Sequence, residues 1–406
     1  MLTRIGIFNL KLTITSTTLN ISSNPILRRR TISIMAQRSI AVAITGVGLV
    51  GSEFINQLLS FSLPSTPNSR YNPFKIISLS SSGHTLFSPN GLEVTSTSWK
   101  DSLTQAPPKD PKDLISELSK LASGSSYNGV VFVDNTSSDS IASLYPLILS
   151  QNIHVITPNK KAFSSTSTLY ESIKAASLTS GAKYLNESTV GAGLPVVATL
   201  KDLVNTGDKV KKVEGVFSGT FSYIFNEFSK PGETEGGEKF SEVVKKAKAL
   251  GYTEPHPADD LTGSDVARKL TILSRIIPSS QPLPEGYLSV STTSLVPDPL
   301  LKSDANEFMS RLPEYDSKFD ELRDEARKNG EVVRYVGVID LEKGSVKADM
   351  VKYPKDHPFA TSLGGSDNII MFHTERYGKR PLIVQGAGAG AAVTAMGVMS
   401  DLLKLL

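Results

Sequence analysis

A short segment past the middle of the chain combines several acidic side chains with a lysine. It begins at Glu254, continues through Asp259 and Asp260, and ends at Asp265 and Lys269. Carboxylates this close together are costly unless they meet a cation, so we expect them to hold the ammonium group of a substrate. A lysine beside them is suited to transfer a proton when an alcohol and a carbonyl interconvert. The segment therefore indicates a small substrate that carries an amine and a hydroxyl.

Asp265 and Lys269 are four residues apart, which places both side chains on one face of a helix, about 6 Å apart at Cβ. Gly263-Ser264 is a capping sequence that would start this helix. The alternative is an exposed surface pair, which would contribute only about 0.3–0.5 kcal/mol. The acidic residues just before the helix favour the interpretation as a reactive site.

A glycine pattern near residue 46 predicts a dinucleotide cofactor. Gly46, Gly48 and Gly51 follow an apolar run and precede a helical pattern, which is the context that this motif requires. The first glycine makes the turn, the second admits the pyrophosphate, and the third lets helix and strand pack closely. The alternative is a purely structural turn. The expected cofactor-binding residues of this loop are Gly46, Val47, Gly48, Leu49, Val50 and Gly51.

The cofactor preference is left open by the end of the second predicted strand. It reads Ser-Ser-Ser-Gly-His at 80–84, with neither a carboxylate for the ribose of NAD nor an arginine for the phosphate of NADP. A second glycine loop, from Gly386 to Gly390, follows an apolar strand. We expect it to approach the bound cofactor, although a second dinucleotide site or a simple tight turn would also fit.

The elements that must position these residues alternate between strand and helix in the first half. Apolar runs at 39–44, 74–79, 129–134 and 152–157 predict strands, and helical spacing is present at 50–59, 114–121 and 141–149, with a loop region at 80–110. This order predicts an α/β fold with a doubly wound parallel sheet of the Rossmann type. Two lysines, Lys160 and Lys161, follow the last of these strands at the edge where ligands bind.

The second half of the chain has a different order of predicted strands and helices. Strands at 211–217 and 332–338 with helices at 240–250 and 264–276 predict a mixed α+β sheet, followed by a strand at 381–385 and a terminal helix. We predict a leader at 1–37, a dinucleotide-binding domain at 38–186 completed by 386–406, and a substrate and dimerisation region at 187–385.

Composition excludes several functions. The 406-residue chain has no cysteine, so it cannot use a thiol nucleophile, a thiolate zinc site or a disulfide. No apolar run is long enough to cross a membrane. Its net charge of +3 comes from the first residues, because no acidic residue precedes Glu53. The remainder is slightly acidic, which argues against nucleic-acid or membrane-surface partners.

The leader itself is basic, rich in Ser and Thr, and free of acidic residues, as organellar transit peptides are. The alternatives are a disordered extension or an upstream start, since Met35 lies just before the first strand. We expect a cytoplasmic protein, or an organellar one if the leader is a transit peptide.

Three other catalytic patterns are weaker. Tyr170 and Lys174 have the spacing of short-chain dehydrogenases, but the glycine spacing differs from that family. His256 could imitate the histidine of hydroxyacid dehydrogenases, although its flanking prolines suggest an exposed loop. Ser366-Asp367-Asn368 has the form of a β-lactamase motif but lacks the Ser-x-x-Lys nucleophile.

Several longer segments, in the same order from about residue 40 to the end, resemble homoserine dehydrogenase. The resemblance is to the short monofunctional fungal kind, without a kinase or a C-terminal regulatory domain. The segments are TPNKKAF (157–163), ESTVGAGLP (187–195), FSGTFSYIFN (217–226), LGYTEPHPADDL (250–261) and DVARK (265–269).

The resemblance implies NAD(P)-dependent, reversible reduction of L-aspartate 4-semialdehyde to L-homoserine, in threonine, methionine and isoleucine biosynthesis. It implies that Lys269 gives the proton, that Asp265 positions it, and that Lys161 faces both nicotinamide and substrate. The implied substrate-binding residues are Glu254, Asp260, Gly219 and Thr220, and the further cofactor-binding residues are Thr136, Ser137, Lys161, Gly390 and Thr394.

The resemblance also implies a monovalent cation such as Na⁺, bound mostly by backbone carbonyls, and a homodimer joined through a sheet in the middle region. The implied cation residues are Glu187, Val190, Ala192 and Leu194. Two rival hypotheses remain. One is a catalytically inactive nucleotide-sensing scaffold with the same fold, and the other is a different amino- or hydroxyacid dehydrogenase.

Overall fold

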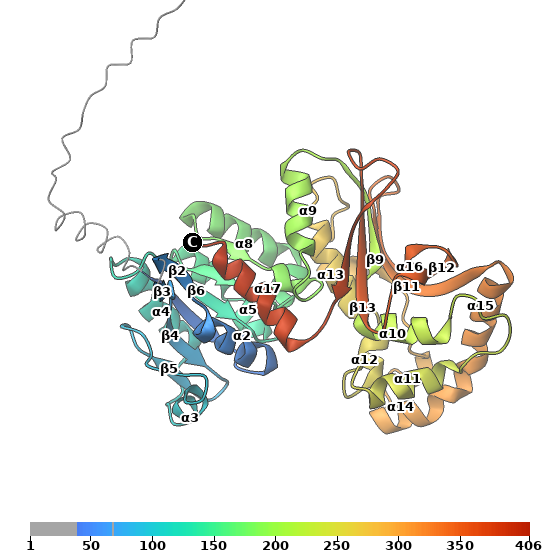
Figure 1. Cartoon of the computed structure of the whole chain (residues 1–406), viewed down its shortest axis with the longest axis horizontal. Coiled ribbons are helices and arrows are strands. Elements are labelled where there is room, and N and C mark those ends of the chain that lie inside the picture. The colour runs from blue at the N-terminus through green and yellow to red at the C-terminus, as the bar shows by residue number, and fades with distance from the viewer. Residues whose placement is uncertain (1–38, 67–68) are drawn as a thin grey trace, which may run out of the picture. The chain divides into compact units, whose positions relative to one another are not determined.

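A computed structural model describes residues 39–66 and 69–406, so the leader predicted at 1–37 lies outside the described residues (Figure 1). The first half of this part forms a six-stranded sheet with the strand order β5-β4-β1-β6-β7-β8. Only β5 is antiparallel to its neighbour, and the other pairs are parallel. The strands are β1 (Ile40–Thr45), β4 (Phe74–Ser80), β5 (Thr85–Phe87), β6 (Gly129–Asp134), β7 (His154–Ile156) and β8 (Tyr184–Leu185).

Both faces of this sheet are covered by helices because its central strands are apolar on both sides. Ala41 of β1 belongs to a core shared with α4 (Pro111–Ala122) and α6 (Tyr145–Ser150). Its neighbour Val42 belongs to a second core, with α2 (Leu49–Ser60) and the terminal helix α17 (Ala391–Leu403). Successive side chains of a strand point to opposite faces, which is why one strand serves both cores. Helices α2 and α17 lie side by side (Figure 1).

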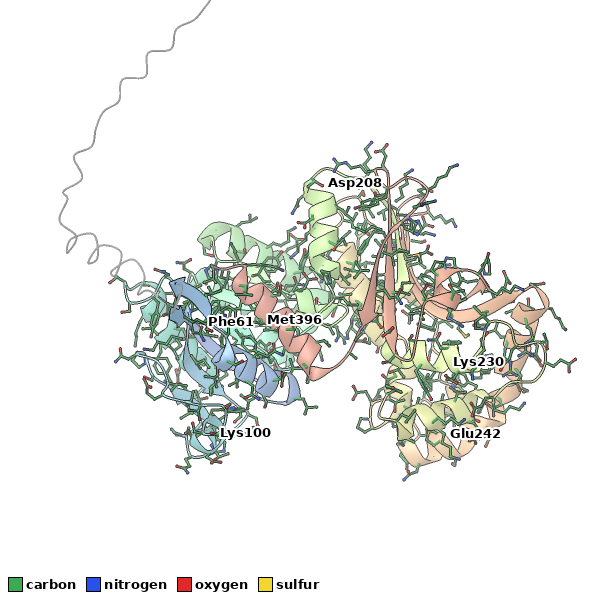
Figure 2. The ribbon with its side chains drawn as sticks, viewed as in Figure 1. Phe61, Lys100, Asp208, Lys230, Glu242 and Met396 are labelled. Atoms are coloured by element: carbon green, nitrogen blue, oxygen red, sulfur yellow. The ribbon has the colours of Figure 1, made fainter. Side chains whose placement is uncertain are left out.

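The second half forms another six-stranded sheet, with the order β10-β12-β11-β9-β13-β14. Only β10 is parallel to its neighbour, so the sheet is mixed. Asp208 lies at one end of it (Figure 2). The carboxylate of Asp208 accepts the hydroxyl of Thr374 over 2.7 Å. The strands are β9 (Val210–Val216), β10 (Ser291–Thr292), β11 (Glu331–Asp340), β12 (Ser345–Pro354), β13 (Asp367–Thr374) and β14 (Leu382–Ala387).

Helices α10 (Gly219–Phe228) and α13 (Ser264–Ser274) pack on one face of the mixed sheet and carry several site residues. Shorter elements connect the larger ones. The remaining helices are α3 (Trp99–Thr104), α5 (Asp139–Ala142), α7 (Lys161–Ser164), α8 (Ser167–Ser180), α9 (Val196–Asn205), α11 (Phe240–Ala249), α12 (Pro257–Leu261), α14 (Ala305–Arg311), α15 (Asp316–Lys328) and α16 (Pro358–Thr361), with 3-10 turns η1 (Glu187–Thr189), η2 (Gly286–Ser289), η3 (Asp298–Leu300) and η4 (Leu312–Tyr315) and a small hairpin of β2 (Leu63–Thr66) and β3 (Ser69–Tyr71).

The predicted fold class is confirmed: a Rossmann-type sheet precedes a second, mixed sheet. The single helix predicted at 141–149 is wrong, because α5 ends at Ala142 and α6 begins at Tyr145. Pro146 occupies the first turn of α6, where its missing N–H is tolerated, whereas it would interrupt a continuous helix. The loop region at 80–110 also contains β5 and α3. In the described part of the chain, no helix is long and apolar enough to cross a membrane.

Candidate active site

A cavity of about 1210 Å³ brings most of the predicted site residues together. Its walls come from the loops after β6 and β7, the start of α10, the segment from Gly251 to Lys269, and the glycine loop before α17. Ligands of open α/β sheets bind at the carboxyl ends of the strands, and this cavity has that position. Thirteen predicted residues line it: Val50, Thr136, Ser137, Lys161, Ala192, Gly219, Thr220, Glu254, Asp260, Asp265, Lys269, Gly390 and Thr394.

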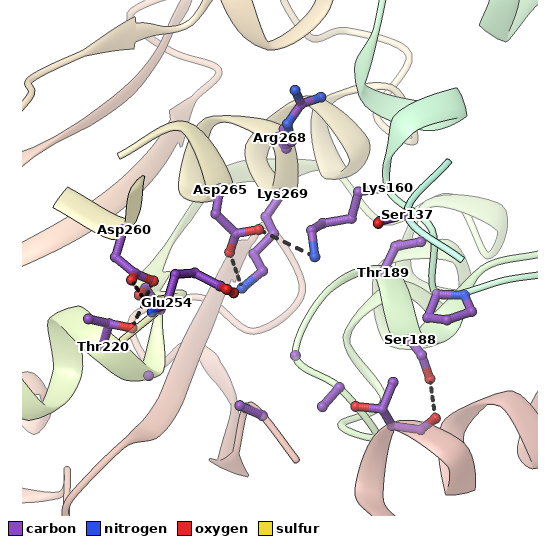
Figure 3. Close-up of a pocket in the computed structure, with 18 of the residues that line it drawn as sticks. Ser137, Lys160, Ser188, Thr189, Thr220, Glu254, Asp260, Asp265, Arg268 and Lys269 are labelled. Carbon is purple, nitrogen blue, oxygen red and sulfur yellow. Dashed lines mark hydrogen bonds and ion pairs between the residues drawn. The ribbon is translucent and has the colours of Figure 1, made fainter. Parts of the chain in front are cut away.

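Lys269 and Asp265 form the pair that their spacing predicts. The ammonium of Lys269 lies 2.8 Å from Oδ2 of Asp265 (Figure 3). It also donates to the backbone carbonyl of Phe217 over 2.7 Å. The side chain of Lys269 is 9% exposed, whereas that of Asp265 is 44% exposed, so the carboxylate faces the cavity. The pair is therefore not a solvated surface ion pair.

Lys160 is a third member of this cluster, which the sequence reasoning did not assign. Its ammonium lies 3.3 Å from Oδ1 of Asp265 (Figure 3). Lys161 also lines the cavity, but its ammonium is paired with Asp139 at 2.7 Å. The one signal in the sequence was the pair of adjacent lysines at the strand edge, which did not show which of them would meet Asp265.

The charges in this cluster shift each other's protonation. Burial lowers the pKa of Lys269, and the positive charge of Lys160 lowers it further, while Asp265 acts in the opposite direction. Burial alone would raise the pKa of Asp265, but Lys160 and Lys269 together hold it below its usual range. The result is a stable carboxylate beside an ammonium that releases its proton more readily than an exposed lysine does.

The acidic segment folds back on itself at the start of α12. Asp260 accepts the backbone N–H of Glu254 at Oδ2 over 2.7 Å, and Oδ1 lies 3.1 Å from the hydroxyl of Thr220. Burial raises the pKa of Asp260, and the nearby carboxylates of Glu254 and Asp265 add to that effect. Glu254 itself is exposed to the cavity. This end of the cavity is negative and suits a cationic group.

The glycines at 46–51 fit a dinucleotide. A Cβ on Gly51 would lie 1.9 Å from the carbonyl oxygen of Gly46, so only glycine permits this packing, and Gly46 has φ +86°. A Cβ on Gly48 would meet no atom within 4 Å, which leaves open space above the loop. No side chain caps the N-terminus of α2, so its backbone N–H groups remain available to phosphate.

Asn135 is a further residue of this site that the sequence reasoning missed. It lines the cavity, and both polar atoms of its side chain are buried without a hydrogen-bond partner among the described residues. Buried amides normally have partners, so these two atoms are suited to a ligand. Its place directly after β6 was the available signal.

The loops after β6 and β7 are held by a buried carboxylate. Asp134 accepts the hydroxyl of Tyr145 over 2.5 Å and the amide of Asn159 over 3.1 Å at Oδ2, and the backbone N–H of Thr136 over 2.8 Å at Oδ1. Asn159 in turn accepts the backbone N–H of Lys161 over 3.0 Å. This network fixes the loops that carry Thr136, Lys160 and Lys161.

The residues predicted for a cation lie next to the cavity. The carboxylate of Glu187 accepts the N–H groups of Val197 and Ala198, and the carbonyl of Leu194 accepts the N–H of Val196. Ala192 has φ +56°, an uncommon conformation for a residue other than glycine. The described residues contain no cluster of three or more His, Cys, Asp or Glu that could hold a metal. A cation here would depend on backbone carbonyls.

Two of the three weaker patterns lie away from the cavity, whereas Ser366 of the third lines it. His256 is half-buried and caps α12, so the expected exposed loop is wrong. Tyr170 packs against Arg275, and Lys174 is paired with Glu171 on the surface of α8. Neither Tyr170 nor Lys174 lines the cavity.

Comparison with known proteins gives consistent matches. The family model described as "Homoserine dehydrogenase" matches residues 195–403, and "Homoserine dehydrogenase, NAD binding domain" matches 46–187. The homoserine dehydrogenase of Emericella nidulans is 48% identical over 381 residues, which cover 90% of this chain and 98% of that protein. A crystal structure of a Candida auris protein of unknown function has a TM-score of 0.82 at 43% identity, covering 91% of this chain and 98% of that one.

A more distant solved structure has the same fold. It is a hyperthermophilic archaeal homoserine dehydrogenase in complex with NADPH, with a TM-score of 0.64 and 21% identity, covering 90% of this chain and 97% of that one.

Proposed function

The chain belongs to the homoserine dehydrogenase family, and we propose that Lys269 transfers the proton in the reaction of that family. It is an NAD(P)-dependent oxidoreductase that acts on a hydroxyl group, converting L-aspartate 4-semialdehyde to L-homoserine and back, a step of amino-acid biosynthesis.

The observation that carries the proposal is the position of the Lys269 ammonium between the Phe217 carbonyl and Asp265 at the cavity. In the reduction, Lys269 donates a proton to the aldehyde oxygen as negative charge develops there. In the oxidation, neutral Lys269 accepts the proton of the hydroxyl. Burial lowers the pKa of Lys269 and brings both protonation states closer to the working pH, as efficient proton transfer requires. Asp265 fixes the ammonium by accepting one of its hydrogens.

The cofactor residues follow from the open space at the glycine loop and the partnerless amide of Asn135. When bound, NAD(P) supplies or accepts the hydride. Gly46 to Gly51 and the start of α2 would hold its phosphates. Thr136, Ser137, Lys161, Gly390 and Thr394 would contact the half of the cofactor nearer Lys269.

The substrate residues follow from charge and position. Glu254, exposed at the negative end of the cavity and close to Asp260, would bind the substrate ammonium. Gly219 and Thr220 open α10, so their backbone and hydroxyl would bind the polar groups of the substrate. Lys161 would lie between substrate and cofactor.

The proposal also includes a bound cation, a homodimer, a division into domains and a cellular compartment. A monovalent cation at the carbonyls of Glu187, Val190, Ala192 and Leu194 would brace the loop beside the cavity. A homodimer is supported by β14, an edge strand of the mixed sheet on which Ile383 is 41% exposed.

Residues 38–186 with 386–406 would form the cofactor domain, and 187–385 the substrate and dimerisation region. We place the protein in the cytoplasm, or in an organelle if residues 1–37 prove to be a transit peptide.

The test follows oxidation of NADPH and of NADH with L-aspartate 4-semialdehyde, in the full chain and in Lys269→Ala. We expect turnover to fall by about 10²–10⁴-fold in the variant, because a general acid is lost. Lys174→Ala is the matched control, because Lys174 contacts Glu171 and the ring of Tyr170 and does not line the cavity, so its turnover should be unchanged.

Unchanged turnover in Lys269→Ala would move the proton donor to another group, with Lys161 next. Tight nucleotide binding without turnover would instead support a sensing scaffold.

A further inference from the structure

The carbonyl oxygen of Phe217 accepts two side-chain donors at once. Besides the ammonium of Lys269 at 2.7 Å, it accepts Nδ2 of Asn368 over 3.0 Å. Asn368 lies on β13, 151 residues further along the chain, and is fully buried. A carbonyl oxygen has two lone pairs and can accept both bonds. The atom that orients Lys269 is therefore itself held from a distant strand.

Asn368 is in turn enclosed by the glycine loop that lines the cavity. It pairs with Gly386 of the neighbouring strand β14. A Cβ on Gly388 would lie 2.1 Å from Nδ2 and 2.4 Å from Oδ1 of Asn368, so the backbone of Gly388 lies directly against the amide. Gly388, Ala389 and Gly390 line the cavity. The side-chain amide of Asn368 therefore lies between the glycine loop at 388–390 and the Phe217 carbonyl that accepts the ammonium of Lys269.

The second polar atom of Asn368 indicates that this amide is present for more than packing. Oδ1 is buried and has no hydrogen-bond partner among the described residues. A buried acceptor without a donor destabilises the fold, whereas an apolar side chain of similar size would avoid that cost. The bond from Nδ2 to Phe217 is the contact that such a replacement would lose.

We infer that Asn368 is a positioning residue, which fixes the Phe217 carbonyl so that the ammonium of Lys269 points at the reacting oxygen of the substrate. This inference rests on the proton-transfer role proposed for Lys269. Asn368 does not touch the substrate, since it does not line the cavity. Its effect passes through one backbone carbonyl.

The test uses Asn368→Asp, which keeps the shape, removes the donor and adds a negative charge beside the carbonyl. We expect kcat to fall by about 10–100-fold, while KM for semialdehyde and NADPH changes by less than about threefold, because binding contacts remain. The added charge favours protonated Lys269, so the rate of homoserine oxidation should rise with pH only at higher pH than in the unchanged protein.

Thr374→Val is the matched control, because it removes a buried hydrogen bond on the same strand, to Asp208, away from the cavity. A merely structural role for Asn368 would give both variants the same loss of melting temperature and an unshifted pH profile, and that result would overturn the inference. Asn368→Ser serves if the aspartate variant does not fold. It should lower kcat without the upward pH shift, and an unchanged kcat would contradict the inference.

A double-mutant cycle separates this inference from the proposed function. If Lys269 transfers the proton, Asn368→Asp should cause little further loss in a Lys269→Ala background. A large loss in Lys269→Ala with none in Asn368→Asp would reject only the role of Asn368. Full activity in Lys269→Ala would reject the proton-transfer role of Lys269, and with it the basis of this inference.

Discussion

Lys160, in the loop after β7, places its ammonium 3.3 Å from Oδ1 of Asp265, in the first turn of α13. The other oxygen of the same carboxylate meets Lys269 at 2.8 Å. Asp265 therefore bridges two lysines, one from the loop after β7 of the first sheet and one from α13, which packs on the mixed sheet. The arrangement couples the protonation of Lys269 to a residue that is not its sequence neighbour.

Lys160→Ala should shift the pH dependence of homoserine oxidation to higher pH. The positive charge of Lys160 helps to keep the pKa of Lys269 low, so its removal should let that pKa rise. Oxidation needs neutral Lys269, so its rate should reach half its maximum at higher pH. Stopped-flow rates between pH 6 and about pH 10 would measure the shift, over the range where lysine pKa values fall. A profile displaced to lower pH would contradict the coupling.

Lys161→Ala should act differently from its neighbour. Lys161 lines the cavity, but its ammonium meets Asp139 and not Asp265. We expect kcat/KM to fall by about 10–100-fold through lost contacts to cofactor and substrate. The pH at which the rate is half-maximal should stay within about 0.3 units of its value in the unchanged protein. A shift of a full pH unit would correspond to a change of about 1.36 kcal/mol. Steady-state kinetics of Lys160→Ala and Lys161→Ala, side by side, would check this, and identical profiles would refute it.

Asp260→Asn should weaken substrate binding and should make KM for homoserine less dependent on pH in acid. Burial raises the pKa of Asp260, so this carboxylate is neutralised at a higher pH than an exposed aspartate. In the unchanged protein, KM for homoserine should therefore increase as the pH falls through that raised pKa. The variant should have a KM about tenfold higher at neutral pH, equivalent to about 1.4 kcal/mol, and little further change in acid. A KM that still rises in acid in the variant would contradict this role of Asp260.

Gly51→Ala and Gly48→Ala should separate folding from cofactor binding. A methyl group on Gly51 would meet the Gly46 carbonyl at 1.9 Å, so the variant should lose melting temperature even without cofactor. At Gly48 a methyl group meets no protein atom within 4 Å. That variant should keep its melting temperature but bind NADPH about tenfold or more weakly, as measured by calorimetry. Equal affinity would argue that the phosphates lie elsewhere.

Glu214→Gln should lower the free energy of unfolding, and it should lower it more at neutral pH than in acid. Burial would raise the pKa of Glu214, but His373 at 2.8 Å and Lys212 lower it to about 2. Because this folded pKa lies below the unfolded value, the stabilisation is full above about pH 4.5 and is lost as the pH falls towards 2. The difference between the folded and unfolded pKa of Glu214 corresponds to about 3 kcal/mol of unfolding free energy.

Urea unfolding at pH 7 and pH 3 would measure this effect. The two proteins should differ most at pH 7, and a constant difference at both values would contradict the linkage.

The sequence predicted contacts that follow from local spacing. Asp265 and Lys269 share a helical face because they are four residues apart, and β6 was found with its bounds because Gly129 to Asp134 is a compact apolar run. The helix predicted at 141–149 is wrong because it placed Pro146 in a helix interior, whereas Pro146 lies in the first turn of a new helix, α6.

Contacts between distant segments could not be predicted in this way. The choice between Lys160 and Lys161 depends on how the loop after β7 approaches α13, and adjacent lysines look alike in sequence. The bond from Asn368 uses the backbone carbonyl of Phe217, and a carbonyl is present at every residue. Asn135 is identified by missing partners, which only the packed structure reveals.

The packing of α17 against α2 has a consequence for synthesis of the chain. The core that contains Val42 and Phe54 also contains Ala395, Val398 and Leu402 of α17, which is synthesised after both sheets. Until those residues emerge, α2 covers one apolar face of the first sheet without its partner α17, although the strands are already translated. Exposed apolar surface of this kind promotes aggregation, so we expect nascent chains to engage chaperones until α17 has emerged. A nascent chain stalled before residue 391 should be sensitive to protease, and one in which residues 391–403 have emerged should be less sensitive.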